Sequence, residues 1–192
     1  MKDLRTGEKV LSRDREGKHV YSAVILFLDK NDHKHTTFIT IETADHNSLT
    51  ITDKHLIYVL NTNSSDEYSS VYAEEIRIGQ YVLIPTGLNS FKPSKVVVKA
   101  TKVSNGVYAP LTTEGNIVVD GVLTSCYGII DSEFIAHAAF APVRAVHWLL
   151  QYISLPFNYA IDGSSSNGVH WYAEVLYDIG ILIFDKSVMF SV

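Results

Sequence analysis

Asp3-Leu-Arg-Thr-Gly-Glu-Lys-Val-Leu11 recurs later in the chain as Glu75-Ile-Arg-Ile-Gly-Gln-Tyr-Val-Leu83, with its Arg, Gly, Val and Leu in identical register. The same offset aligns Ser22-Ala-Val24 with Ser94-Lys-Val96, and a slightly different one aligns Leu49-Thr-Ile-Thr-Asp53 with Asn116-Ile-Val-Val-Asp120. Short apolar strings match often by chance, but these three matches keep the same order. They predict a duplicated β unit that closes on itself with approximate two-fold symmetry.

The segments around these repeats are typical of short β-strands. They are rich in Val, Ile, Thr, Tyr and Phe, and clusters of Asp, Asn, Gly and Ser separate them. An all-β domain is therefore favoured over alternating strands and helices. The predicted strands are residues 20–28, 36–42, 49–52, 56–60, 80–85, 94–103 and 116–119.

Composition excludes several classes of protein. The 192 residues, 46% of them hydrophobic, suffice for a core in one or two domains. A net charge of -5 has the wrong sign for binding nucleic acid through its phosphates, so we expect no nucleic-acid partner. The single cysteine, Cys126, cannot form an internal disulfide, a Cys-rich zinc site or a CxxC pair. The first four residues do not open a signal peptide, so any export signal is expected upstream.

Charge and aromatic content change near Glu133. Only six of the 37 charged residues follow it, whereas eleven of the 21 aromatic residues do. We therefore predict a boundary that divides the chain into residues 1–133 and 134–192. In the second part, a helix is expected from Pro142 with an apolar face, a Ser/Gly-rich linker at 162–168, and a second helix at about 169–184. This amphipathic hairpin either packs on the β domain or offers a surface to an apolar ligand or membrane interface.

Thr52-Asp-Lys-His55 lies between two predicted strands, so its Thr and His should project together from a strand-turn-strand. In the second copy of the repeat, the position equivalent to His55 is Val122. An imidazole exchanges protons near neutral pH, and a hydroxyl can orient a substrate amide. A His at the end of a strand also commonly has only a structural role, and spacing alone leaves both readings open.

Asp29 follows an apolar strand and could act as a general base if its surroundings favour the neutral acid. The composition of residues 29–33 nevertheless favours a hairpin turn. Cys126 lies among residues typical of strands, which predicts a buried, inert thiol. His33 and His35 lack a second pair of ligands at zinc spacing, so no metal site is expected.

Several blocks of the sequence, taken together and in order, resemble the C-terminal autoprocessing region of Hedgehog proteins. That region is similar to the Hint domain shared with inteins. The blocks extend over essentially the whole chain, and the second and fourth are specific to the family. They are Thr50-Ile-Thr-Asp-Lys-His-Leu56, Gly106-Val-Tyr-Ala-Pro-Leu-Thr112, Gly115-Asn-Ile-Val-Val-Asp120, Ser125-Cys-Tyr127, Ala136-His137 with Phe140-Ala-Pro142, and Gly168-Val-His-Trp-Tyr172.

The resemblance implies a mainly β fold, a Hint-type pseudo-two-fold β horseshoe followed by the amphipathic helical hairpin. Residues 1–133 would form the Hint autoprocessing domain without its first strand, and residues 134–192 the sterol-recognition region. The implied reaction is autocleavage. An opening Cys attacks the preceding carbonyl to form a thioester, and the 3-hydroxyl of cholesterol displaces it, which leaves a sterol ester on the released signalling domain.

By position in the resemblance, His55 would activate the scissile amide, Thr52 would orient it, and Asp29 would be the base for the sterol hydroxyl. Cys126 matches a later, supporting family position. The residues implied for sterol binding are Trp148, Leu149, Trp171, Tyr172 and Leu176.

The partners implied are the chain's own N-terminal signalling domain in cis and membrane cholesterol, a co-substrate. No cofactor or metal is expected, since acyl transfer needs neither. The intact precursor would be processed in the secretory pathway, in the lumen of the endoplasmic reticulum, and its product would be extracellular or membrane-anchored.

Two departures from the family pattern change this expectation. Asp53-Lys54 replaces the common Pro-Ala, which adds charge beside His55. The opening Cys has no counterpart in these residues, so the chain alone is predicted to be inactive. A catalytically inactive, truncated Hint and sterol-binding module is the alternative. Intein-type splicing is disfavoured, because the sequence ends in Ser191-Val192 instead of a His-Asn pair before a nucleophile.

Overall fold

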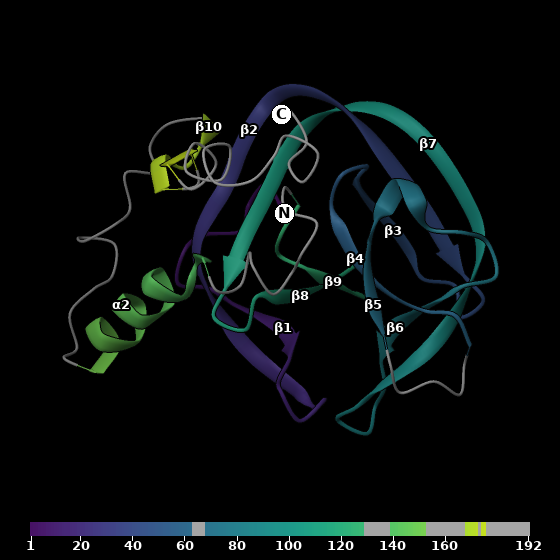
Figure 1. Cartoon of the computed structure of the whole chain (residues 1–192), viewed down its shortest axis with the longest axis horizontal. Helices are drawn as coiled ribbons and strands as arrows, with labels where there is room; N and C mark the ends of the chain where they lie inside the picture. Colours follow the sequence, from purple (N-terminus) through teal and green to yellow (C-terminus); the bar gives the residue numbers. More distant parts are fainter. Residues whose placement is uncertain (63–67, 129–138, 153–167, 173, 176–192) are drawn as a thin grey trace.

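The computed structural model describes residues 1–62, 68–128, 139–152, 168–172 and 174–175 (Figure 1). Two long antiparallel strands, β2 (His19–Thr43) and β7 (Phe91–Thr112), run side by side as a curved arch. Shorter antiparallel strands pair with this arch and with one another to give the predicted, mainly β horseshoe. They are β1 (Lys9–Arg13), β3 (Ser48–Thr52), β4 (Leu56–Leu60), β5 (Ser69–Tyr72), β6 (Tyr81–Pro85), β8 (Asn116–Val119) and β9 (Val122–Ser125), with a 3-10 turn, η1 (Ala73–Glu75).

The duplication read from the sequence is present in the backbone hydrogen bonds. The N–H of Gly7 donates to the carbonyl of Val24 at 2.8 Å, and the N–H of Gly79 donates to the carbonyl of Val96 at 2.9 Å. Both glycines have a positive φ, 90° and 99°, which an L side chain rarely adopts. Each repeat therefore enters its strand through the same glycine turn.

The two halves meet where β4 pairs with β9, at Ile57 opposite Thr124. In the alignment of the repeats these two residues are equivalent, and an antiparallel pairing of equivalent positions marks a two-fold axis. His55 and Val122 each stand two residues before this pair. Close to the two-fold axis, equivalent backbone positions therefore carry an imidazole in one half and an apolar side chain in the other.

The structure contradicts the turn expected at residues 29–33. This segment belongs to β2, which joins the two strands predicted at 20–28 and 36–42. Its pairing with β7 continues on both sides, from Asp29 opposite Ala109 to His35 opposite Asn105, with a register irregularity between them. Backbone pairing with a strand distant in the sequence overrides the local composition, and the extra residues of β2 form a bulge.

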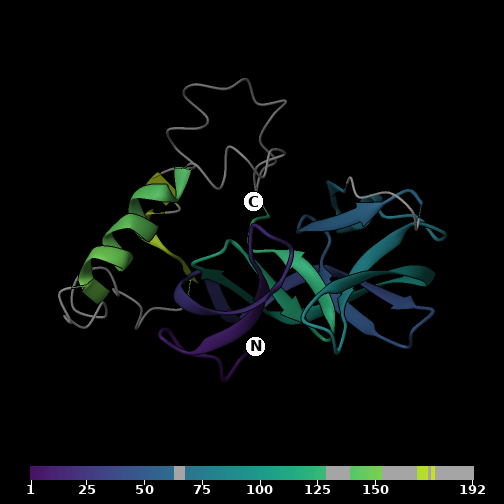
Figure 2. The same ribbon diagram turned by 90° about the horizontal axis from the view of Figure 1, so that it is seen from below.

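In the described part of the tail, α2 spans Ala141–Tyr152, as the position of Pro142 predicts. Its first turn is anchored, since Phe140 and Val143 belong to a buried cluster around Leu26, Leu111 and other residues of the β domain. Figures 1 and 2 agree that α2 lies at the side of the β domain remote from β6.

The second helix does not begin at Val169 as predicted. Gly168–Val169 form a short strand, β10, which pairs with β2, and helical backbone follows from Trp171. The N–H of His170 donates to the carbonyl of Leu28 at 2.9 Å, so pairing with β2 determines this conformation.

The predicted boundary at Glu133, the linker up to residue 167 and most of the second helix lie outside the described residues. In the described part, no helix is both long and apolar enough to cross a bilayer.

Candidate functional site

The turn between β3 and β4 brings the two predicted active-site side chains together. The N–H of His55 donates to the carbonyl of Thr52 at 3.0 Å, and the N–H of Lys54 donates to Oδ1 of Asp53 at 2.8 Å. These hydrogen bonds fix a tight turn between two strands. Thr52 and His55 consequently line the same cavity, as the strand-turn-strand pattern predicts.

This cavity has a volume of about 160 Å³ and lies between the β3–β4 turn, β7 and β9. Residues from the two halves of the duplication form its walls, together with the first residue of the chain. Beside Thr52 and His55, the side chains with functional groups that line it belong to Met1, Thr50, Tyr108, Thr124, Ser125 and Cys126.

The ring of His55 is held by the backbone opposite it. Its Nε2 lies 2.9 Å from the carbonyl oxygen of Ser125. A carbonyl only accepts hydrogen bonds, so Nε2 is the atom that donates and Nδ1 of the neutral ring carries a lone pair. Burial lowers the pKa of His55 below its ordinary value, against a smaller opposing effect of the Ser125 carbonyl. At neutral pH the side chain is a neutral imidazole with Nδ1 available as a base.

Asp53 and Lys54, which depart from the family pattern, are not among the residues that line the cavity. The ammonium group of Lys54 forms an ion pair with Glu74, near η1. Asp53 accepts the hydrogen bond from the N–H of Lys54. Burial, and not either of these charges, is the main cause of the lowered pKa of His55.

Cys126 is buried, as the sequence predicts, with 1% of its surface exposed. Its N–H donates to the carbonyl of Gly115 at 2.9 Å, and its Sγ lies 3.6 Å from Oγ1 of Thr112. The thiol nevertheless belongs to the wall of the His55 cavity. Its position supports the packing of the site.

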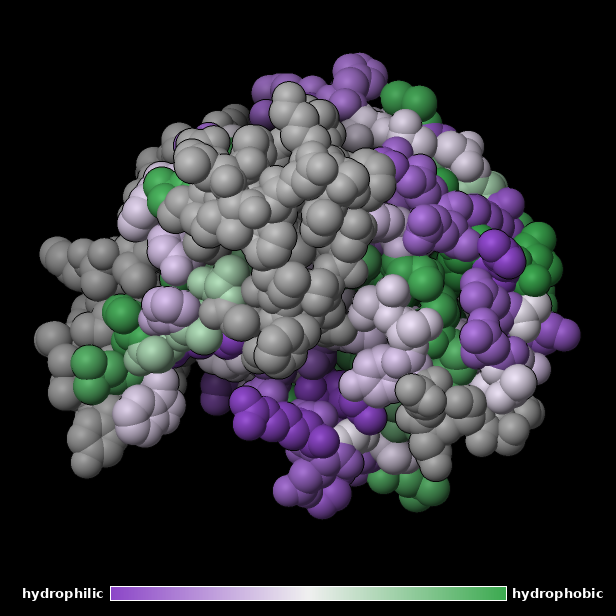
Figure 3. Space-filling view, in the orientation of Figure 1, coloured by the Kyte–Doolittle hydropathy of each residue, from purple (hydrophilic) through white to green (hydrophobic). Residues whose placement is uncertain are grey.

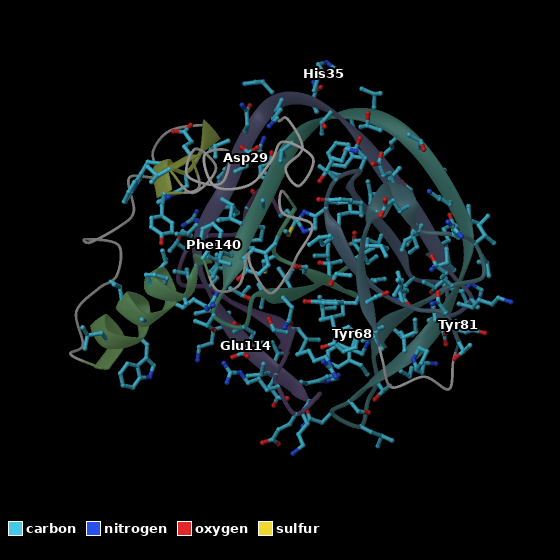
Figure 4. The ribbon with its side chains drawn as sticks, viewed as in Figure 1. Asp29, His35, Tyr68, Tyr81, Glu114 and Phe140 are labelled. Atoms are coloured by element: carbon cyan, nitrogen blue, oxygen red, sulfur yellow. The ribbon has the colours of Figure 1, made fainter. Side chains whose placement is uncertain are left out.

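Asp29 lies on the arch of β2 and β7, on the side towards β10 (Figure 4). It does not line the His55 cavity, although its partner in register, Ala109, does. One carboxylate oxygen, Oδ2, accepts a hydrogen bond from Nζ of Lys34 at 3.2 Å. No donor among the described residues reaches the other oxygen, Oδ1, which is buried. Burying an unpartnered acceptor costs free energy, so Oδ1 is a candidate to receive a hydroxyl group from a ligand.

β10 brings the tail to this carboxylate, because Val169 lies directly opposite Asp29. Trp171, just beyond β10, is 55% exposed, and Trp148 and Leu149 of α2 are 66% and 52% exposed. Figure 3 shows hydrophobic side chains at the surface of this end of the molecule.

Tyr172 behaves differently from these exposed residues. It is half-buried against Phe140, and its hydroxyl donates to the carbonyl of Ala139 at 3.1 Å. Its role in the described structure is therefore to anchor the tail. Leu176, the remaining residue predicted for sterol binding, lies outside the described residues.

Sequence reasoning missed several residues of the site, among them Tyr108, Ser125 and Lys34. Tyr108 and Ser125 line the cavity and belong to conspicuous sequence blocks, which could have suggested them. Nothing local in the sequence distinguishes Lys34 from its neighbours.

Within the described residues, no group of three or more His, Cys, Asp or Glu side chains could hold a metal ion.

Comparison with known proteins supports the fold and identifies relatives. The chain is 34% identical over 195 residues to the sonic hedgehog protein of Danio rerio, covering 98% of this chain and 46% of that protein. It is 34% identical over 197 residues to protein hedgehog of Drosophila virilis, covering 97% of this chain and 41% of that protein. The chain thus spans about half the length of the curated relatives it matches.

Solved intein structures share the fold. The KlbA intein precursor from Methanococcus jannaschii matches with a TM-score of 0.52 and 19% identity, over 61% of this chain and 63% of that one. The PabCDC21-1 intein matches with a TM-score of 0.52 and 16% identity, over 61% of this chain and 68% of that one. At these identities the likeness concerns the fold alone. The sequence model of the Hint module family matches residues 1–185. The chain therefore belongs to the Hint module family, with hedgehog proteins among its relatives.

Proposed function

We propose that this chain is part of a hedgehog-type precursor whose intact form cleaves itself through a Cys thioester and transfers cholesterol to the released signalling domain. The observation that carries the proposal is the shared cavity of Met1, Thr52 and His55. A peptide bond in the segment preceding Met1 would enter the site beside an imidazole and a hydroxyl group. The signalling domain would be the substrate in cis.

In the first step, Nδ1 of His55 accepts the proton of the attacking thiol, and the sulfur bonds to the preceding carbonyl carbon. The C–N bond then breaks, and the nitrogen takes the proton back from Nδ1 as it leaves as an amine. Thr52 orients the amide. Since nucleophile and carbonyl belong to neighbouring residues, most of the entropy cost of a bimolecular attack is avoided.

In the second step, Oδ1 of Asp29 accepts the proton of the sterol 3-hydroxyl while the sterol oxygen bonds to the thioester carbonyl. The C–S bond breaks, and the sulfur leaves as a thiolate that takes up a proton. The exposed side chains of Trp148, Leu149 and Trp171, which we assign to the sterol or membrane surface, would cover the apolar rings. Burial of apolar area, at roughly 25 cal/mol per Å², would supply most of the binding free energy.

Neither step needs a metal or cofactor, so cholesterol is the sole co-substrate in this proposal. We place the reaction in the secretory pathway, where the precursor would meet membrane cholesterol. The product would then be extracellular or anchored to a membrane by its sterol.

The test uses the complete precursor that contains this chain, with cleavage by dithiothreitol and by cholesterol measured separately. Dithiothreitol attacks any thioester directly, so it reports the first step without the sterol base. We expect His55→Ala to abolish both reactions, and Asp29→Ala to keep dithiothreitol cleavage but lose sterol transfer. His46→Asn, which removes an exposed imidazole from the turn between β2 and β3, is the control for both. An Asp29→Ala precursor that still transfers sterol would contradict the proposal.

A second candidate is a sterol-binding module without processing activity. The exposed apolar side chains of Trp148, Leu149 and Trp171 favour it. This candidate predicts saturable binding of a sterol photoprobe to the chain itself, lost when residues 139–192 are deleted. It also predicts that no cysteine and no signalling domain are encoded upstream, which the transcript sequence decides.

A further inference from the structure

The ion pair between Lys34 and Asp29 joins residues that a regular strand would separate. Nζ of Lys34 lies 3.2 Å from Oδ2 of Asp29. Five residues of regular strand span about 16 Å, and an odd spacing places the two side chains on opposite faces. The contact therefore depends on a departure from regular β2 geometry.

The bulge in β2 provides this departure. Asn31 lies opposite Val107 and His35 lies opposite Asn105, so more residues of β2 than of β7 lie between the two pairs. β2 advances four residues where β7 advances two, so the regular spacing and alternation of side chains are interrupted just before Lys34. Bulges commonly redirect a side chain in this way beside functional sites.

Two hydrogen bonds fix the bulge. The N–H of His33 donates to Oδ1 of Asn31 at 2.9 Å. The hydroxyl of Tyr108, which lines the His55 cavity, donates to Oδ1 of Asp32 at 2.6 Å. The bulge that presents Lys34 is thus tied to the wall of the cavity in which the thioester would form.

The environment of the ion pair also sets it apart from an ordinary surface pair. The side chains of Lys34 and Asp29 are 34% and 15% exposed. Exposed ion pairs contribute little to stability. A hydrogen bond from a cation to a largely buried carboxylate is stronger, because fewer water molecules compete for the carboxylate. The hydrogen bond from Nζ to Oδ2 restricts rotation of the carboxylate, so the orientation of its buried Oδ1 is restricted too.

We infer that Lys34 is a positioning residue for the acyl-transfer step, an inference that rests on the proposed function of Asp29. Lys34 holds Oδ2, which leaves the buried Oδ1 in place to accept the proton of the incoming sterol hydroxyl. It takes no part in thioester formation, which belongs to the His55 cavity.

The test compares four variants of the complete precursor, Lys34→Met, Lys34→Arg, Lys30→Met and Asp29→Asn. Lys30 is the matched control, because it lies on the same strand with its ammonium over the ring of Phe27. We expect Lys34→Met to lower the rate of cholesterol-dependent cleavage by about tenfold, with dithiothreitol cleavage within about twofold of the wild type. Lys34→Arg should restore transfer, and Lys30→Met should leave both reactions unchanged.

The outcomes separate this inference from the proposed function. If Asp29→Asn loses transfer while Lys34→Met transfers at the wild-type rate, the role of Lys34 is wrong and that of Asp29 stands. If Lys34→Met and Lys34→Arg slow both reactions equally, Lys34 is merely structural and the inference fails. If Asp29→Asn transfers normally, the proposed function itself fails.

Discussion

The imidazole of His55 donates from Nε2 to the carbonyl oxygen of Ser125 across a distance of 2.9 Å. Ser125 ends β9, on the opposite half of the duplication from His55. The hydrogen bond therefore links the β3–β4 turn to the end of the strand that precedes the buried Cys126. It also fixes the tautomer that leaves Nδ1 as a base.

Burial of His55 predicts a pH dependence of stability. Its pKa in the folded chain lies below the ordinary value of 6.5, so between these two values the unfolded chain binds more protons. The free energy of unfolding should therefore fall as the pH drops below about 6.5, by at most about 1.4 kcal/mol per pH unit from this residue. Urea unfolding of the wild type and His55→Gln between pH 5 and 8 measures the difference. Equal slopes in the two proteins would contradict the buried, neutral imidazole.

The duplicated glycine turn predicts a matched pair of destabilising substitutions. A Cβ at Gly7 or Gly79 meets no atom within 4 Å, so Ala at either site costs only backbone strain at positive φ. We expect Gly7→Ala and Gly79→Ala each to lower the free energy of unfolding by about 1–2 kcal/mol. Gly87→Ala, where a Cβ also meets nothing, should cost little. Chemical denaturation measures the free energy of unfolding of all three variants. An unchanged value for Gly79→Ala would contradict the positive φ at this glycine.

The exposed aromatic side chains of the tail predict a sterol-specific defect. Trp171 is 55% exposed beside the strand that pairs with Asp29, so Trp171→Ala should barely change the unfolding transition. In the complete precursor it should raise the cholesterol concentration for half-maximal cleavage by about tenfold, because apolar contact area is lost. Tyr21→Ala, which removes a 69% exposed aromatic ring from the β domain, is the control. An equal effect of both substitutions would argue against sterol contact at Trp171.

The buried thiol predicts slow chemical labelling. Cys126 has 1% of its surface exposed and is the single cysteine of the chain, so the labelling signal reports this residue alone. A maleimide should react with it only through unfolding, and the rate should rise in urea in step with loss of structure. Mass spectrometry of timed samples gives the rate. Rapid labelling in native buffer would show that the cavity admits the reagent to Sγ.

The local sequence was sufficient for the duplicated β unit and for the pairing of Thr52 with His55. Strand propensity and turn residues are local properties, and a repeat is found by comparing two stretches of sequence directly. None of them requires knowledge of the partner strands. The same holds for the start of α2, where Pro142 suits a first turn. Family resemblance then supplied candidate roles for Asp29 and the tail, which remain predictions.

Tertiary structure alone decided what surrounds Asp29. Local composition favoured a turn there, but pairing with β7 made residues 29–33 part of one strand with a bulge. That bulge brings Lys34 back to the carboxylate, and β10 places the tail opposite it. These contacts join segments far apart in the sequence, or depend on a bulge that interrupts a strand. Their free energy comes from backbone pairing and burial between distant residues, which no short window of sequence contains.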